Sequence, residues 1–320
     1  MRLLKLVPDN TNIGFVRLRG WAFGLTMLLT VIAVFATVTR GLNLGVDFVG
    51  GLMLEAKFDR AAPLNELRSD LDRLELGEVS LQQFGSADTV SIRLPLPKSQ
   101  DPGATTAVVN KVQSTVKARF PTVQFLRTDT VSGKVSGELI RNGILAVIIA
   151  VFAIALFGWF RFEWQFGVST FVAIGHDVLM TLGFFAVTRL EFDLNIVAAV
   201  LTIVGYSIND KIVIDDRIRE NMRKYRQMDM SGIVDLSVNE TLPRTVMTSL
   251  TVLLALGALL IWGGHVLRGF TAAMMLGVIV GTYSSIYVSS SLLITLGLKP
   301  QPEKEQKVKA NAGDRIREGY

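Results

Sequence analysis

The residues most able to do chemistry lie in one apolar stretch, FDLNIVAAVLTIVGYSINDKIVIDDRIREN, which covers residues 192–221. A run of about twenty apolar residues can cross a bilayer as a helix, and this stretch opens with such a run. Asp210 falls inside it, and a charged tail begins at Asp215. A carboxylate at mid-depth of a membrane helix costs about 2.5–3.5 kcal/mol. Asp210 is therefore a candidate for handling a proton or an ion inside the membrane.

The other polar residues of this stretch share one helical face with Asp210. Asn195, Thr202 and Tyr206 are followed by Asn209 or Asp210, at intervals of seven, four and three or four residues. Such spacing places side chains on one side of a helix. We expect this side to face protein or water rather than lipid. The alternative is that Asp210 lies near the helix end and reaches the lipid headgroups.

Arg244 is the second candidate, because it follows Pro243 at the start of the next apolar stretch. If these two helices run in opposite directions, Asp210 and Arg244 lie at a similar depth. A carboxylate and a guanidinium at one depth can pair, which lessens the cost of burying either charge. Burial favours the protonated form of the Asp210 carboxyl, whereas a nearby guanidinium favours the ionised form. Separation of the two helices or entry of water would therefore cause Asp210 to take up or release a proton. The pattern predicts a proton switch, with a static ion pair that fixes helix register as the alternative.

Two more polar groups could extend a proton relay from this pair. His176 and Asp177 lie together in the preceding apolar stretch, and Asn209 lies beside Asp210. His176 and Asp177 could equally form a satisfied polar pair packed against a neighbouring helix. The residue types leave both interpretations open.

Glycines mark two places where backbones are expected to turn tightly or come close. Gly50 and Gly51 follow Asp47 at the junction between the first apolar stretch and a soluble region, where glycine permits tight turns. Gly277 and Gly281 have GxxxG spacing in the last apolar stretch, and small residues let membrane helices approach closely. We expect the GxxxG face to pack against another subunit or another half of an assembly.

The composition is that of a membrane protein. Of 320 residues, 50% are hydrophobic and 19% are charged, and the mean hydropathy is positive. The sequence has no cysteine and two histidines, which excludes disulfide and thiol chemistry and disfavours a zinc site. Its basic residues gather at the ends of apolar stretches, which indicates membrane topology rather than nucleic-acid binding. We expect membrane lipid around the chain and no cofactor, with protons as the coupling ion.

Six apolar stretches are long enough to span a membrane. They are residues 21–39, 139–160, 166–187, 194–214, 244–262 and 269–296. Basic residues crowd the connectors after the second and fourth stretches and the tail, so the positive-inside rule places both chain ends in the cytoplasm. We expect a cytoplasmic N-terminus over residues 1–20 and a disordered cytoplasmic tail over residues 299–320.

Residues 40–138, between the first two spans, have the composition of a soluble α+β domain. Strand-like runs are Leu52–Phe58, Val79–Phe84, Thr89–Leu94 and Val123–Thr128. Helical periodicity covers Leu64–Leu76 and Thr105–Phe120. The order β-α-β-β-α-β is that of a ferredoxin-like unit. The topology above places this domain in the periplasm.

Several motifs closely resemble those of the SecF family, over nearly the whole chain up to the tail. LNLGVDFVGG follows the first span, FRFEW precedes the third, and GHDVLMTLG lies within the third. VGYSINDKIVIDDRIREN lies in the fourth span, RTVMTSLT opens the fifth, and GVIVGTYSSIYVSS marks the sixth. Together these motifs are very specific.

The resemblance implies a six-helix membrane protein of the RND superfamily with a periplasmic domain after its first helix. Such a protein is the smaller subunit of the SecDF accessory translocon of the bacterial inner membrane and pairs with SecD, a pseudo-symmetric half. The complex associates with the SecYEG channel and YajC, and uses the proton-motive force to help complete preprotein export after the SecA ATPase has acted. The family's essential acid matches Asp210 and its essential arginine matches Arg244. Lys211, beside the acid, is expected to perturb its titration.

Three other functions fit parts of the pattern. Half of an RND-type proton-driven exporter of lipids or small molecules would share Asp210 and Arg244, but its outer domains are usually larger. An intramembrane aspartyl protease would use Asp177 and Asp210, which requires both carboxylates at one depth. A structural scaffold would tolerate asparagine in place of Asp210. The sequence favours a transport subunit without enzymatic activity.

Overall fold

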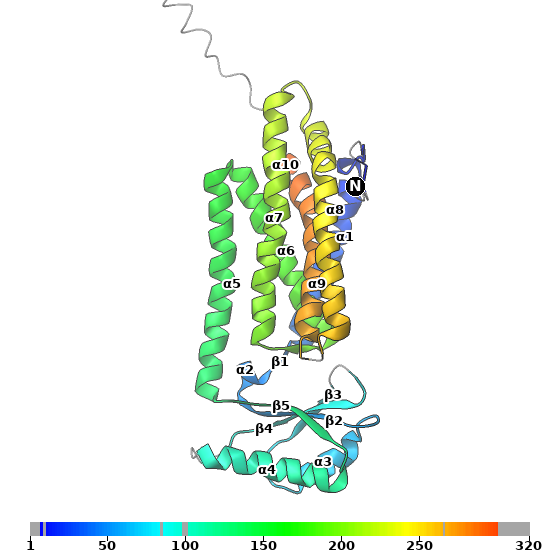
Figure 1. Cartoon of the computed structure of the whole chain (residues 1–320). Helices are drawn as coiled ribbons and strands as arrows, with labels where there is room; N and C mark the ends of the chain where they lie inside the picture. The colour runs from blue at the N-terminus through cyan, green and yellow to red at the C-terminus, as the bar shows by residue number, and fades with distance from the viewer. Residues whose placement is uncertain (1–6, 9–10, 84–85, 98–101, 265, 300–320) are drawn as a thin grey trace, which may run out of the picture.

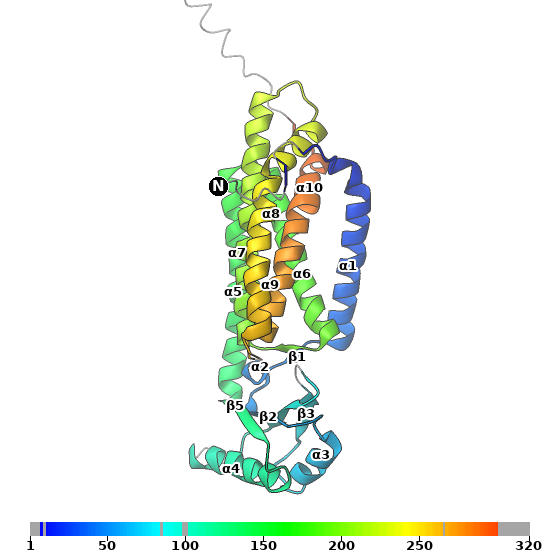
Figure 2. The same cartoon turned by 45° about the vertical axis from the view of Figure 1, so that its right-hand side comes forward.

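The computed structural model describes residues 7–8, 11–83, 86–97, 102–264 and 266–299. The predicted disordered tail from residue 300 onward lies outside this part, as do residues 1–6 and 9–10 of the predicted N-terminal segment. Within the described part, six helices are long and apolar enough to cross a membrane. Figures 1 and 2 show them side by side, with a smaller α/β domain beyond one end. The predicted fold class, six spans with an α/β domain between the first two, is confirmed.

Each predicted apolar stretch falls on one long helix. The helices are α1 (Arg19–Arg40, preceded by the 3₁₀ turn η1, Val16–Leu18), α5 (Gly133–Arg161), α6 (Trp164–Thr188), α7 (Leu194–Lys224), α8 (Met230–Trp262) and α9 (Arg268–Tyr283). The last span continues through a π-helix, η2 (Ser284–Ser289), into α10 (Ser290–Thr295). Ser132, Asp193 and Asp229 accept hydrogen bonds from the first backbone N–H groups of α5, α7 and α8, which fixes where these helices begin.

Helices α7 and α8 extend beyond the predicted spans, at the end of the bundle far from the α/β domain (Figure 1). The segment between the predicted fourth and fifth spans is helical except for a short turn, and Pro243 lies inside α8 rather than before it. The predicted span of residues 244–262 therefore lies within a longer helix. Proline is tolerated inside a membrane helix because neighbouring groups satisfy the freed backbone carbonyl.

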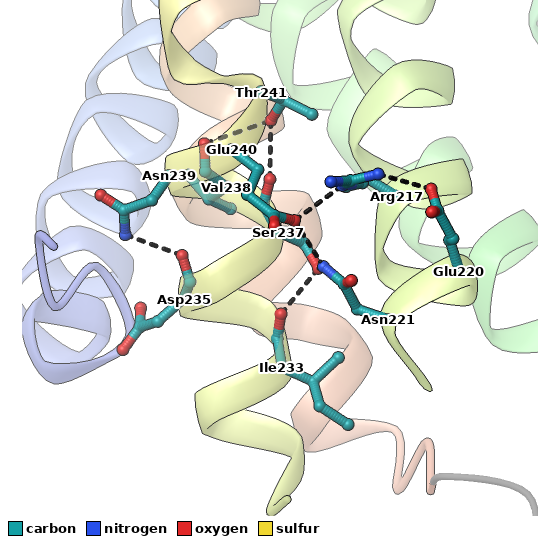
Figure 3. A network of polar contacts seen from close by, with 10 residues as sticks. All are labelled: Arg217, Glu220, Asn221, Ile233, Asp235, Ser237, Val238, Asn239, Glu240 and Thr241. Carbon is teal, nitrogen blue, oxygen red and sulfur yellow. Dashed lines mark hydrogen bonds and ion pairs between the residues drawn. The ribbon is translucent and has the colours of Figure 1, made fainter. Parts of the chain in front are cut away.

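Polar side chains hold these two extensions together, as Figure 3 shows. Arg217 of α7 donates to Glu240 of α8 and to Glu220 of its own helix, both at 2.6 Å. Asn221 donates to Ser237 Oγ at 3.0 Å and to Glu240 at 2.7 Å. The basic connector of the sequence is thus a cross-linked helical hairpin.

The domain between α1 and α5 has the expected β-α-β-β-α-β order. Its elements are β2 (Gly51–Lys57), α3 (Leu64–Asp72), β3 (Ser80–Gln83), β4 (Thr89–Leu94), α4 (Pro102–Arg119) and β5 (Gln124–Val131). The four strands form one antiparallel sheet in the order β3-β4-β2-β5. Both helices cover the face away from the membrane helices, where Leu52, Leu54 and Ile92 are fully buried (Figure 2). The other face of the sheet meets the membrane helices.

Two helix crossings are so close that a side chain would not fit. At Gly183 of α6, a Cβ would lie 2.3 Å from the Cβ and 2.6 Å from the Cα of Ala33 in α1. At Gly277 of α9, a Cβ would lie 2.3 Å from Ile203 of α7, and Gly281 also faces α7. The GxxxG face thus packs within the chain. The prediction that it packs against another subunit or half is wrong, because the spacing does not identify which helix comes close.

A buried ion pair cross-links α6 and α7. Lys211 Nζ donates to Asp215 Oδ2 at 2.7 Å and to Ser169 Oγ of α6 at 3.0 Å. The side chains of Lys211 and Asp215 are 2% and 3% exposed. Asp215 therefore does not belong to an exposed charged tail, as its place in the sequence had suggested. Lys211 turns to Asp215, which lies four residues on and so on its own helix face, rather than to Asp210.

Gly183→Ala is expected to destabilise the protein, because the added Cβ overlaps the Ala33 backbone and α1 must move. Overpacking of this kind costs about 1–3 kcal/mol. Gly175→Ala on the same helix is the matched control, since a Cβ there meets nothing within 4 Å. Thermal unfolding in detergent should give a lower midpoint for Gly183→Ala alone. Equal midpoints for the two variants would refute the close crossing of α1 and α6.

Lys211→Met is expected to destabilise the protein by about 3–5 kcal/mol, because it leaves the buried Asp215 carboxylate without its cationic partner. The double variant Lys211→Met/Asp215→Leu should recover most of this loss, since apolar residues of similar volume can replace a buried ion pair. Denaturant titration in mixed micelles measures both variants. If the double variant lost as much free energy of unfolding as Lys211→Met, the conclusion that Lys211 and Asp215 compensate each other's charge would be contradicted.

Candidate functional site

Asp210 lies in the interior of α7, and its residue is 2% exposed. Its Oδ2 atom has no hydrogen-bond partner among the described residues. A buried polar atom without a partner costs free energy and marks a place where water, a proton or another group can act. Asp210 is therefore a buried acid of a spanning helix, with one oxygen that the described residues leave without a hydrogen bond.

Arg244 lies on α8 and is exposed, one helix away from Asp210. It is within electrostatic reach of the Asp210 carboxylate. No ion pair within 4.0 Å joins the two side chains in the described part of the chain. The structure thus brings the predicted pair near each other, in an unpaired arrangement.

A groove beside Arg244 opens at the end of the bundle that carries the α7–α8 hairpin. Its volume is about 550 Å³, and Ile212 and Val213 of α7, Thr241 of α8 and Arg161 of α5 also line it. Ile212 and Val213 lie within one turn of Asp210. The groove therefore leads from outside the bundle to the Arg244 guanidinium at nearly the depth of the acid.

The register of the antiparallel pair α7–α8 identifies a residue that the sequence did not. Tyr206 donates to Ser249 at 3.2 Å, so one turn farther along α7 Asp210 lies opposite Thr245. Thr245 is buried, and its hydroxyl has no partner among the described residues. Two unsatisfied polar groups thus face the same α7–α8 interface. A threonine in an apolar helix gives no sequence signal without this register.

The polar residues that were predicted to share one face of α7 lie on different sides of the helix in the structure. Asn195, Thr202 and Asn209 are exposed on the outside of the bundle, whereas Asp210 is turned inward and Tyr206 bonds to α8. Asn209 and Asp210 are therefore not alternatives for one place on a common face. The exposed polar residues form a row on α7 that none of the described residues covers.

Asp177 has a different and fully occupied environment. One carboxylate oxygen lies 3.1 Å from His176 Nδ1, and the other accepts from Ser207 at 2.6 Å and Ser284 at 2.9 Å. These serines come from α7 and from the π-helix, so the carboxylate joins three helices. Asp177 does not meet Asp210, which disfavours a catalytic pair of aspartates. The sequence missed Ser207 and Ser284 because serine is common in membrane helices.

The predicted junction residues lie where the α/β domain meets the helix ends. Asp47 is in α2 (Val46–Val49) and accepts from the Leu194 N–H at 3.0 Å, at the start of α7. Gly50 and Gly51 have φ values of 75° and 120°, which favour glycine. A Cβ on Gly51 would also lie 2.8 Å from the Leu94 carbonyl oxygen. Asp47 and the two glycines thus shape the entry to the domain.

Two family models match the chain. The one described as protein export membrane protein SecD/SecF, C-terminal, matches residues 111–299. The one described as the SecD/SecF GG motif matches residues 35–62. The first contains Asp177, Asp210 and Arg244, and the second contains the junction with Gly50 and Gly51.

Relatives are similar over almost the whole chain. The protein translocase subunit SecF of Rhodobacter capsulatus is 42% identical over 314 residues, which cover 94% of each chain. The protein translocase subunit SecF of Cereibacter sphaeroides is 41% identical over 310 residues, covering 95% of this chain and 96% of the relative.

Two solved structures are similar in fold. The crystal structure of SecDF, a translocon-associated membrane protein from Thermus thermophilus, matches with a TM-score of 0.82 at 35% identity. The crystal structure of SecDF in the super-membrane-facing form matches with a TM-score of 0.66 at 34% identity. The matches cover 91% and 96% of this chain, which spans 40% of each solved chain. From the two family models and these identities, the chain belongs to the SecF family of protein translocase subunits, which are membrane transport subunits and not enzymes.

Proposed function

We propose that this chain is the proton-coupled half of a SecDF complex that uses the proton-motive force to assist preprotein export. Its partner is SecD, a pseudo-symmetric half, and the complex acts with the SecYEG channel and YajC in the bacterial inner membrane. Similarity to SecDF, described as translocon-associated, supports these partners. The row of exposed polar residues on α7 supports a partner helix packed against it, since such residues are costly in lipid.

The orientation follows from charge. Basic residues gather on the α7–α8 hairpin, at Arg217, Arg219, Arg223, Lys224 and Arg226. The positive-inside rule favours this end in the cytoplasm, together with both chain termini. The α/β domain then lies in the periplasm, where it can contact an emerging preprotein.

The observation that carries the proposal is the buried Asp210 carboxyl with an unsatisfied oxygen beside an exposed Arg244. Burial without a partner favours the protonated acid, and approach of the guanidinium favours the carboxylate. A helix movement that brings Arg244 onto Asp210 therefore releases a proton, and separation allows one to bind. The groove lined by Arg244 supports access of water to this guanidinium from the cytoplasmic side.

His176, Asp177 and Asn209 have separate parts in this proposal. The contacts of Asp177 with three helices support an anchor for the helix bundle, and a relay through His176 stays a prediction. Asn209 faces outward beside Asp210, where it can bond to a partner helix.

Asp210→Asn is expected to reduce gradient-dependent preprotein export to the level seen when the gradient is collapsed, because asparagine cannot exchange a proton. Expression and thermal midpoint should stay unchanged, since the amide has the same shape. Export is measured in inverted membrane vesicles with SecD and SecYEG. The control is Asp216→Asn on the same helix, where the carboxylate is exposed. Full gradient-dependent export by Asp210→Asn would refute the proposal.

Arg244→Gln is expected to remove gradient-dependent export as well, because no charge remains to favour the carboxylate. Arg244→Lys should keep part of the activity, since it keeps the charge but loses the planar guanidinium. The same vesicle assay measures the export activity of both variants. Arg223→Gln, on the exposed hairpin, is the control. Equal activity of Arg244→Gln and the unmodified chain would exclude the electrostatic role of Arg244.

A further inference from the structure

The sheet of the α/β domain turns a polar face toward the membrane helices. Along β2, alternate residues point to opposite faces, so Glu55 lies opposite the face that carries Leu54. Glu55 pairs across the sheet with Ser91 of β4 and Arg127 of β5. Glu55 and Ser91 are 4% and 3% exposed, so the membrane helices and their connectors cover this polar face.

Charged contacts join this face to the ends of the membrane helices. Arg93 of β4 donates to the Leu44 carbonyl at 2.8 Å and pairs with Glu191 at 3.0 Å. Glu191 lies in β6 (Glu191–Phe192), which joins α6 to α7 and pairs with β1 (Asn43–Leu44). The ion pair therefore connects the outer domain directly to the connector between two spanning helices.

A small cavity lies within this junction. Its volume is about 30 Å³, enough for one or two water molecules. Five carboxylates line it: Asp47, Glu55, Asp129, Glu191 and Asp193. Ser91 also lines it, and the buried hydroxyl of Ser91 has no partner among the described residues. The cavity is thus polar and acidic, and the Ser91 hydroxyl is available to bond a water molecule inside it.

The charges around the cavity do not balance. The carboxylates come from α2, β2, β5, β6 and the start of α7, and two guanidinium groups face them, Arg93 from β4 and Arg127 from β5. Glu78 and Arg93 both line a separate, more open pocket of the junction. The side of the cavity near α9 contributes Gly269 and Phe270, which carry no charge. Among the described residues, five carboxylates therefore face two guanidinium groups at this cavity.

Two of these acids take up protons more readily than an exposed carboxyl does, because they are buried at this junction. Burial raises the pKa of Glu191, and the Arg93 charge offsets this in part. Burial raises the pKa of Asp193, and the hydrogen bonds from Asn195 and the Ile196 N–H offset this in part. A group whose pKa is raised by docking stabilises the docked state below its free pKa, and this contribution is lost as the pH rises through the docked pKa. Acid should therefore favour docking.

Two glycines with positive φ lie in the chain between α1 and the domain. Gly41 and Gly50 have φ values of 62° and 75°, and each lies outside the neighbouring helix. Glycine at such values allows the backbone to turn without steric strain. The domain is otherwise attached through the start of α5 after β5.

We propose that this junction is a proton-controlled latch, which holds the α/β domain on the membrane helices when it has taken up a proton and loosens when its carboxylates are all ionised. The latch does not depend on proton exchange at Asp210. It should respond to the pH on the side of the membrane where the domain lies.

The latch can be tested by the distance between two spin labels on the full chain in lipid nanodiscs with a cysteine-free SecD. The native sequence has no cysteine, so Thr39→Cys on α1 and Ser114→Cys on α4, both exposed, take the labels alone. The docked distance should dominate at about pH 5, and a second, broader population should grow toward about pH 8. A shift of one pKa unit in one acid changes the docked-to-open ratio by about tenfold.

Two variants imitate the protonated acids. Glu191→Gln can still accept from Arg93, and Asp193→Asn still caps α7, because asparagine is an equally good N-cap. In each variant, the spin-label distance of the docked state should still dominate at about pH 8. Glu138→Gln, at an exposed site on α5, is the matched control and should respond as the unmodified chain does.

The outcomes separate the latch from the proposed transport role. A distance that does not change with pH, or variants that respond like Glu138→Gln, would overturn the latch. The pH response should persist in Asp210→Asn, whose export activity is tested separately. Loss of the response in Asp210→Asn would also overturn the latch, because the junction would then follow the membrane acid.

Discussion

The structure depends on how charge is tolerated inside the membrane. Water cannot solvate a charge there, so each ionised side chain needs an opposite charge, hydrogen-bond donors or a path to water. Asp215 meets this need with Lys211, and Asp177 meets it with two serines and a histidine. One oxygen of Asp210, Oδ2, has no hydrogen-bond partner among the described residues. This contrast separates the acids that hold helices together from Asp210, the acid that we propose changes its protonation state.

The helices that surround these acids are positioned by small residues and by caps. Gly183 brings α6 against α1, and Gly277 brings α9 against α7. Asp193 starts α7 at the junction with the outer domain, and the same residue lines the acidic cavity. The start of the helix that carries Asp210 is therefore shared between the membrane bundle and the α/β domain. A structural change at the start of α7 would therefore affect both the membrane bundle and the α/β domain.

Hydrophobic length and residue type predicted much of this from the sequence. Six spans, the β-α-β-β-α-β order and the family resemblance followed from periodicity and motifs. The cost of burying a charge led to the prediction of Asp210 and of Arg244 as its partner, and this prediction of their role remains to be tested. The partners of Lys211 and Asp177 could not be predicted, because each depends on which face of α6 or of the π-helix meets α7. The same limitation explains why Gly277 was expected at another subunit, and why Thr245 and the cavity around Glu191 went unnoticed.

The central claim is that the Asp210 carboxyl changes its protonation state during transport. Infrared difference spectroscopy on the SecDF complex in vesicles tests this most directly, because a protonated buried carboxyl has its own C=O stretching band. On imposing a proton gradient, the account predicts a change in such a band that is absent from Asp210→Asn and retained in Asp216→Asn. A spectrum without a carboxyl band, or with the same band in Asp210→Asn, would contradict it.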